Sequence, residues 1–211
     1  MPGFAHDLRT VLSGEPAPAA ACLRWPVAGA ALHGLALGAS SGEPLLALYS
    51  AVKVPLLLGC SCLVTLPNFY VLHAVLGLAA DFGAACRGLL AAQAALALAL
   101  GAFAPLVAMT FASTANGYLL TVVDGALFAV AAVAGQVVLR RHYARLLARD
   151  RRHRITLASW LVLYVFFAIQ LAWVLRPFLG TPGYPVQFLR DEALQQNAYV
   201  VVFEHLGRMF R

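Results

Sequence analysis

Long apolar runs dominate this sequence and limit what it can fold into. The runs cover residues 45–78, 89–112, 119–139 and 155–178, and a shorter run covers 25–39. A helix needs about 20 apolar residues to cross a hydrocarbon core of about 30 Å. Hydrophobic residues make up 62% of the chain and charged residues 11%, against about 25% charged residues in soluble domains. The sequence therefore predicts an all-α, polytopic transmembrane helical bundle.

We expect five spans between two tails. The N-terminal tail, residues 1–24, is mixed in character, and the C-terminal tail, residues 179–211, ends in a stretch that fits an amphipathic helix over 191–211. The predicted spans are residues 25–39, 45–66, 89–112, 119–139 and 155–178.

Two of these spans have uncertain limits. The run 25–39 would measure only about 22 Å as a helix, and the alternative for it is a signal peptide. The run 45–78 would measure about 51 Å, too long for one perpendicular crossing. Because proline removes a backbone donor, Pro55 and Pro67 are expected to kink this run, with the span ending near Leu66 and 67–78 lying shallow. Pro105 is the third expected kink.

An arginine-rich loop is predicted over residues 140–154. Its seven arginines and Asp150 together give +6, which equals the net charge of the whole chain. The arginines are Arg140, Arg141, Arg145, Arg149, Arg151, Arg152 and Arg154. Arginine-rich loops mark the cytoplasmic side of membrane proteins and can bind anionic lipid headgroups. No soluble domain with a basic face is visible, so nucleic-acid binding is not expected.

Five spans would place this loop, Arg9, Arg24 and Arg87 on one side of the membrane. The remaining arginines, Arg176, Arg190, Arg208 and Arg211, would fall on the other side. The positive-inside rule then predicts a cytoplasmic N-terminus and an outer C-terminus. The heavy use of Ala, Leu and Arg suggests a bacterial inner membrane.

Lys53, Asp124 and Gln170 are polar residues inside apolar runs. Ionisable groups within a membrane are functional candidates, and the five-span topology places all three residues in its outer half. Three interpretations stay open for Lys53 and Asp124. They could lie at the outer interface, with Lys53 reaching the headgroups; they could form a structural ion pair; or they could line an ion or proton pathway.

The other chemistry-bearing residues favour structural roles. His33 and His73 are interpreted as hydrogen-bonded packing residues, with a proton relay as the alternative, and His142 and His153 as solvated loop residues. Cys22, Cys60, Cys62 and Cys86 are interpreted as packing residues. We expect no metal site, no cofactor and no catalytic residues, because the sequence holds none of the common catalytic motifs. The proline-rich segment 177–185 is expected to direct the tail away from the membrane or to cap an outer vestibule.

The stretch from Ala51 to Gly77, with the pattern KVPLL and TLPNFYVLHAVLG, resembles the Yip-type family of five-span membrane proteins and its uncharacterised bacterial relatives. The resemblance extends over residues 45–177 and implies a five-span helical protein. Eukaryotic members of that family are linked to vesicle trafficking and small GTPases, a role that does not carry over to a bacterial chain.

These observations favour a structural, scaffolding or assembly role in the membrane. The Ala- and Gly-rich span 119–139 is expected to pack against a second copy of the chain or a membrane-protein partner. The alternative is a small oligomeric channel or transporter that uses Lys53, Asp124 and Gln170. A membrane enzyme is the least favoured class.

Overall fold

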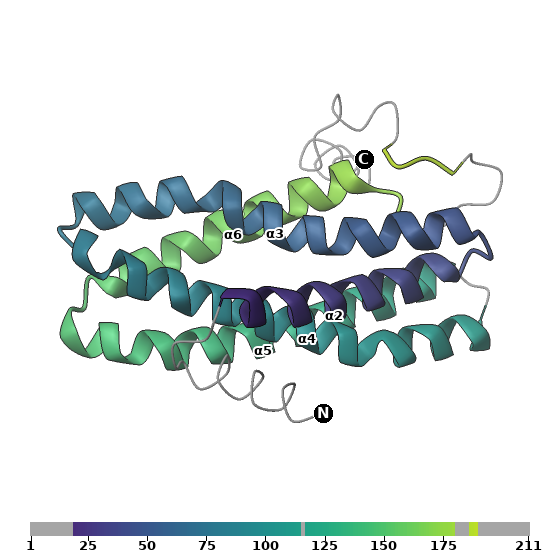
Figure 1. Ribbon diagram of the computed structural model, residues 1–211, viewed down its shortest axis with the longest axis horizontal. Helices are drawn as coiled ribbons and strands as arrows, with labels where there is room; N and C mark the ends of the chain where they lie inside the picture. The colour runs from purple at the N-terminus through teal and green to yellow at the C-terminus, as the bar shows by residue number, and fades with distance from the viewer. Residues whose placement is uncertain (1–18, 115–116, 180–185, 190–211) are drawn as a thin grey trace, which may run out of the picture.

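The computed structural model describes residues 19–114, 117–179 and 186–189. These residues form five α-helices and one short 3₁₀ turn, with no strand among them (Figure 1). The helices are α2 (Ala19–Ala39), α3 (Pro44–Val75), α4 (Phe82–Ser113), α5 (Gly117–Arg149) and α6 (His153–Leu175), and the turn η1 (Ala79–Asp81) precedes α4. The all-α prediction is confirmed. The predicted tails, 1–18 and 190–211, lie outside the described residues, and so does the expected amphipathic helix.

Helices α3 to α6 are long and apolar enough to cross a membrane. Their apolar residues cover the outward surfaces as well as the core, as in helices that are surrounded by lipid. Helices α3 and α4 each contain 32 residues, or about 48 Å at 1.5 Å per residue. This length exceeds a ~30 Å hydrocarbon core, so the helices must tilt or extend beyond it.

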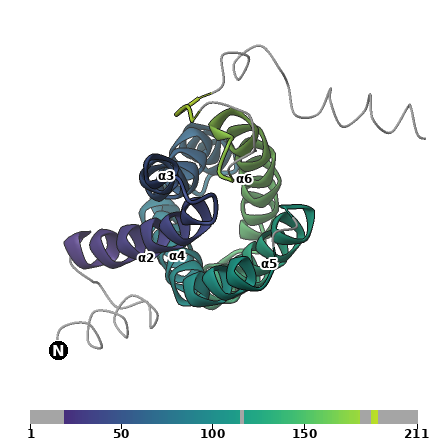
Figure 2. The same ribbon diagram turned by 90° about the vertical axis from the view of Figure 1, so that its right-hand side faces the viewer.

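The helices lie side by side along one axis. α2 packs against both α3 and α4, α5 packs against α4, and α6 packs against α3. Viewed along the axis, the N-terminal end of α2 points away from the bundle, and its other end lies between α3 and α4 (Figure 2). The turn at 150–152 joins α5 to α6 at one end of the bundle, which we call the arginine end, and the starts of α3 and α5 lie at the other end.

Helix α2 approaches its neighbours through glycines. A Cβ atom added at Gly38 would lie 2.6 Å from the Leu46 carbonyl oxygen of α3, and one at Gly29 would lie 2.8 Å from the Ala97 carbonyl oxygen of α4. At Gly34, an added Cβ would overlap the Ser50 carbonyl oxygen. Small residues that let helix backbones meet are typical of membrane helix packing. α2 is therefore an integral helix of this bundle.

The helix does not end near Leu66, because α3 continues through Pro55 and Pro67 to Val75; where the membrane span within α3 ends stays a prediction. A proline costs a helix one hydrogen bond and some strain. Beyond Pro67, the side chains of Phe69 and His73 are buried against the rest of the bundle. Their packing holds the last two turns of α3 in helical form. Pro105 also lies inside a helix, α4.

The predicted arginine-rich loop over 140–154 is mostly helical. α5 extends to Arg149, only residues 150–152 form the turn, and α6 starts at His153. Arginine is a good helix former, and the same stretch buries Tyr143 and Leu146. The apolar side chains on one face of the helix bind it to the bundle, and the arginines occupy the other face.

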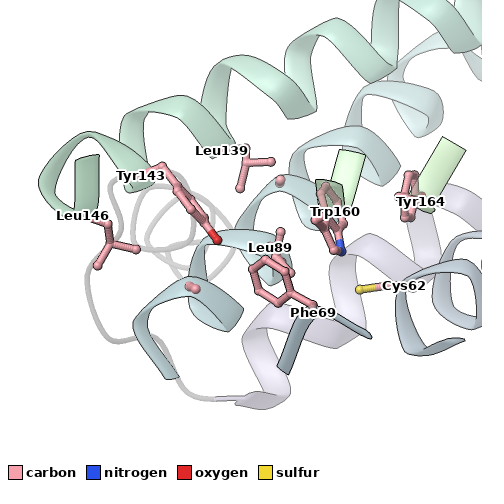
Figure 3. Packing of buried hydrophobic residues seen from close by; sticks show 10 residues of the cluster. Cys62, Phe69, Leu89, Leu139, Tyr143, Leu146, Trp160 and Tyr164 are labelled. Carbon is pink, nitrogen blue, oxygen red and sulfur yellow. The ribbon is translucent and has the colours of Figure 1, made fainter. Parts of the chain in front are cut away.

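The core near the arginine end is built from α3, α4, α5 and α6. Figure 3 shows the α5 side chains Leu139, Tyr143 and Leu146 directed toward those of the other helices. Its members include three of the largest fully buried side chains among the described residues, Trp160, Tyr143 and Phe69. Trp160 and Tyr164 stack on α6 with ring centroids 4.9 Å apart. This core determines the position of the polar groups around it.

Candidate functional site

Asp124 of α5 pairs with His33 of α2. The His33 Nε2 atom lies 3.0 Å from Asp124 Oδ1, and His33 Nδ1 lies 3.0 Å from the Leu100 carbonyl oxygen of α4. The imidazole is fully buried, whereas the Asp124 side chain is 19% exposed. The Phe128 ring packs edge-on against the imidazole, with centroids 5.9 Å apart. One histidine therefore links three helices near the end of the bundle opposite the arginines.

Lys53 is fully buried on α3. Its ammonium group donates a hydrogen bond of 2.7 Å to the Pro177 carbonyl oxygen, just after α6. The rings of Phe178 and Phe188 lie 5.9 and 5.2 Å from the nitrogen, within cation–π range. The interpretation in which Lys53 reaches outward to the headgroups is therefore wrong, because the chain after α6 covers it.

Residues 177–179, the described part of the proline-rich segment, and residue 188 beyond it contact α3. Ser50 adds a second hydrogen bond, from its hydroxyl to the Phe178 carbonyl oxygen at 2.9 Å, and Tyr49 packs edge-on against Phe188 at 5.3 Å between centroids. Pro177 and Phe178, and Phe188 further along the chain, thus lie against α3. Whether the proline-rich segment caps a vestibule stays a prediction, since residues 180–185 lie outside the described ranges.

The ion pair considered between Lys53 and Asp124 is not formed. The carboxylate contacts His33 and the ammonium group contacts Pro177. Gln170 lies on α6 with a partly exposed side chain. The functional roles considered for these three residues stay predictions.

A second polar link, which the sequence analysis overlooked, lies deeper in the bundle. The Tyr164 hydroxyl of α6 donates a hydrogen bond of 3.1 Å to the Gln93 side-chain oxygen of α4. The sequence does contain a sign of this link, because Gln93 is a polar residue within an apolar run. A glutamine in such a run requires a hydrogen-bond partner from another helix.

The arginine end holds a carboxylate that several groups share. Asp81, in η1, accepts a hydrogen bond from Arg149 at 2.8 Å and lies 3.3 Å from His153 Nε2. Arg152 donates to the Leu76 carbonyl oxygen at 2.9 Å and pairs with Asp150. The remaining arginines of this region are exposed; they are Arg140, Arg141, Arg145, Arg151 and Arg154. These contacts fasten the 150–152 turn to the ends of α3 and α4.

His142 and His153, the two histidines predicted to lie in a solvated loop, are both withdrawn from solvent to some degree. His153 is fully buried, which contradicts its predicted place in a solvated loop, and its ring centroid lies 5.8 Å from that of His73. His73 Nδ1 bonds to the Phe69 carbonyl oxygen at 2.8 Å, as expected of a packing residue. His142 is partly buried and bonds to the Val138 carbonyl oxygen at 2.9 Å. Both His142 and His153 therefore belong to the packed helices.

The cysteines and carboxylates do not gather around a common point. Cys60, Cys62 and Cys86 are free thiols in the described residues, and Cys62 is part of the core. Over the same residues, no group of three or more His, Cys, Asp or Glu side chains could hold a metal ion. The polar groups instead form pairs that join one helix to another.

The fold defines the class of this protein as an integral membrane protein built from α-helices, with four helices long and apolar enough to cross the bilayer. Comparison with protein-family models, with curated proteins and with solved structures found no match.

Proposed function

We propose that the protein has a structural or assembly role in its membrane and associates with a second copy of itself through α5. The proposal rests on the partners of two polar groups within the apolar helices: each group bonds to another part of the same bundle. Asp124 ties α5 to α2, and Lys53 ties α3 to the segment after α6. These groups stabilise the bundle itself, as a scaffold requires.

The outward face of α5 supports the association. It exposes Gly125, Ala129, Val130 and Val133, and a Cβ at Gly125 would meet nothing within 4 Å. Small residues on a lipid-facing helix allow another helix to approach closely.

The membrane placement follows the same reasoning. We take α2 as a fifth span because its glycines pack it against α3 and α4. Five spans put the arginine end in the cytoplasm and the C-terminus outside, and a bacterial inner membrane is the expected location. The exposed arginines on the cytoplasmic side are suited to anionic headgroups. The resemblance to the Yip-type family also implies five spans, and membership of that family stays a prediction.

A channel or transporter is the second candidate, favoured by the buried His33–Asp124 pair. Carboxylates and histidines within a membrane recur in proton relays. A membrane enzyme is the least favoured class, because none of the described polar pairs resembles a nucleophile with its base.

Self-association can be tested with two matched glycine variants. Gly125 and Gly59 are both exposed, and at both a Cβ would meet nothing within 4 Å. Each is changed to leucine in the full chain, and dimer formation is measured by energy transfer between labelled copies in lipid vesicles. We expect Gly125→Leu to weaken the association at least tenfold, because leucine keeps the helices apart, and Gly59→Leu to leave it unchanged.

Two outcomes would contradict this proposal. Wild-type protein that stays monomeric at every protein-to-lipid ratio excludes the homo-oligomer. Equal weakening by both variants would show that α5 is not the contact face. A photo-crosslinking residue at position 129, with position 59 as control, then identifies whatever packs on α5 in native membranes.

A further inference from the structure

The His33–Asp124 contact requires a proton, and the requirement follows from hydrogen-bond chemistry. A backbone carbonyl can only accept a hydrogen bond. Because His33 Nδ1 lies 3.0 Å from the Leu100 carbonyl oxygen, Nδ1 must carry a hydrogen and donate it. In a neutral imidazole, the other nitrogen, Nε2, then has only a lone pair.

The other side of the ring faces a second acceptor. Nε2 lies 3.0 Å from Asp124 Oδ1, and an ionised carboxylate has no hydrogen to donate. Two lone pairs at this distance repel each other, so one more proton must lie between them. It can reside on Nε2, giving an imidazolium and a carboxylate, or on Oδ1, giving a neutral imidazole and a carboxylic acid.

Both arrangements leave the pair with no net charge. An unpaired carboxylate in a low-dielectric bundle would be costly. No other ionisable group in the neighbouring helices takes the place of this proton by neutralising the carboxylate. α4 carries none between Arg87 and its end, α5 carries none between Asp124 and Arg140, and Lys53 of α3 contacts Pro177. Neither His33 nor Asp124 has another ionisable partner among the described residues.

We propose that His33 and Asp124 together form a proton-binding site inside the bundle, which takes one proton between Nε2 and Oδ1. The proton exchanges through Asp124, since its side chain is 19% exposed and that of His33 is fully buried. On release, the proton passes to water or hydroxide at the exposed side of the carboxylate. The neutral imidazole and the carboxylate then repel each other, and the link between α2 and α5 is lost.

The test is nitrogen magnetic resonance on the full chain, labelled with ¹⁵N-histidine and reconstituted in lipid, with infrared spectra of the same samples. The His33 signals are assigned by their loss in His33→Gln. At neutral pH, we expect either two protonated ring nitrogens or one protonated nitrogen together with a carboxylic acid band that is absent in Asp124→Asn. Raising the pH should remove one proton, leaving Nε2 unprotonated with no acid band.

Asp124→Asn is the matched control for the structural link. Its amide NH₂ can donate to Nε2, which keeps the hydrogen bond without a bound proton. The contact should therefore persist at alkaline pH in this variant and separate in the wild type, as measured by the nitrogen shift of Nε2. An unprotonated Nε2 with no acid band at neutral pH would overturn the proposal, and so would a wild-type contact that does not change up to alkaline pH.

Discussion

Lys53 illustrates how a single residue in an apolar helix can position a segment that is distant in sequence. Its ammonium group is fully buried and is hydrogen-bonded to Pro177, which lies beyond the last helix. Burying an ammonium group is costly unless it finds good acceptors. The charge is therefore stable here only while the chain after α6 remains folded over α3, and the segment in turn depends on Lys53.

We predict that Lys53→Met loosens this segment. Methionine retains most of the apolar stem but cannot donate to the Pro177 carbonyl oxygen, and hydrogen bonds to charged groups contribute about 1.5–3 kcal/mol. Chymotryptic cleavage near Phe178 in reconstituted protein should become at least several-fold faster. Thr110→Val is the control, since that hydroxyl bonds only within its own helix. Cleavage at the wild-type rate would mean that other contacts hold the segment.

Helix α2 belongs to the bundle because of how it packs against its neighbours. Its hydropathy alone does not reveal this. The helix is not among the four candidate spans, although it contains 21 residues. Its glycines nevertheless bring its backbone against α3 and α4. A hydropathy window does not detect this, because glycine contributes little hydrophobicity but allows the closest approach.

We predict that Gly34→Ala destabilises the bundle through this contact. The added methyl group would overlap the Ser50 carbonyl oxygen, and the neighbour is backbone, which cannot rotate away. Overpacking of this kind costs about 1–3 kcal/mol, so thermal unfolding in detergent should shift down by several degrees. Gly59→Ala is the control, because its Cβ meets open space and alanine is the better helix former. An unchanged transition in Gly34→Ala would mean that α2 is loosely attached.

The sequence predicted the helices well and their ends poorly. Apolar runs located α3 to α6, because lipid-facing and buried surfaces are both apolar. The ends depend on tertiary packing. Phe69 and His73 keep α3 helical beyond Pro67, and Tyr143 and Leu146 do the same for α5 among the arginines. Neither effect appears in a hydropathy pattern.

Partner choice within the bundle was also beyond the sequence. Lys53 and Asp124 were expected at similar depth, and opposite charges at one depth suggested a pair. The orientation of each side chain around its helix decides the partner, and a single sequence does not determine the rotation of each helix. His33 was considered only as a packing residue or a relay. Its two ring nitrogens, which face Leu100 and Asp124, give it a specific partner.

At the scale of the whole molecule, the charge distribution divides the bundle into two unlike ends. The arginine end carries seven exposed arginines near Asp81 and the 150–152 turn; they are Arg140, Arg141, Arg145, Arg149, Arg151, Arg152 and Arg154. The opposite end carries the His33–Asp124 pair and the buried Lys53. Arginines close to the end of a membrane span are rarely moved across the membrane. This asymmetry therefore predicts that the whole bundle has one orientation, with the arginine end in the cytoplasm.

The orientation can be checked at Arg151, which is exposed in the turn between α5 and α6. Arg151→Cys is made in a chain whose own cysteines are replaced by serine, and a membrane-impermeant thiol reagent is added to intact bacterial cells. We expect no labelling until the membrane is opened, because the positive-inside rule places this turn in the cytoplasm. Ser41→Cys, in the turn between α2 and α3, is the matched position at the opposite end and should react in intact cells. Labelling of position 151 alone would invert the topology. Labelling of neither position would still place position 151 inside, but it would leave the α2–α3 turn covered or on the same side, which contradicts α2 as an outward-ending fifth span.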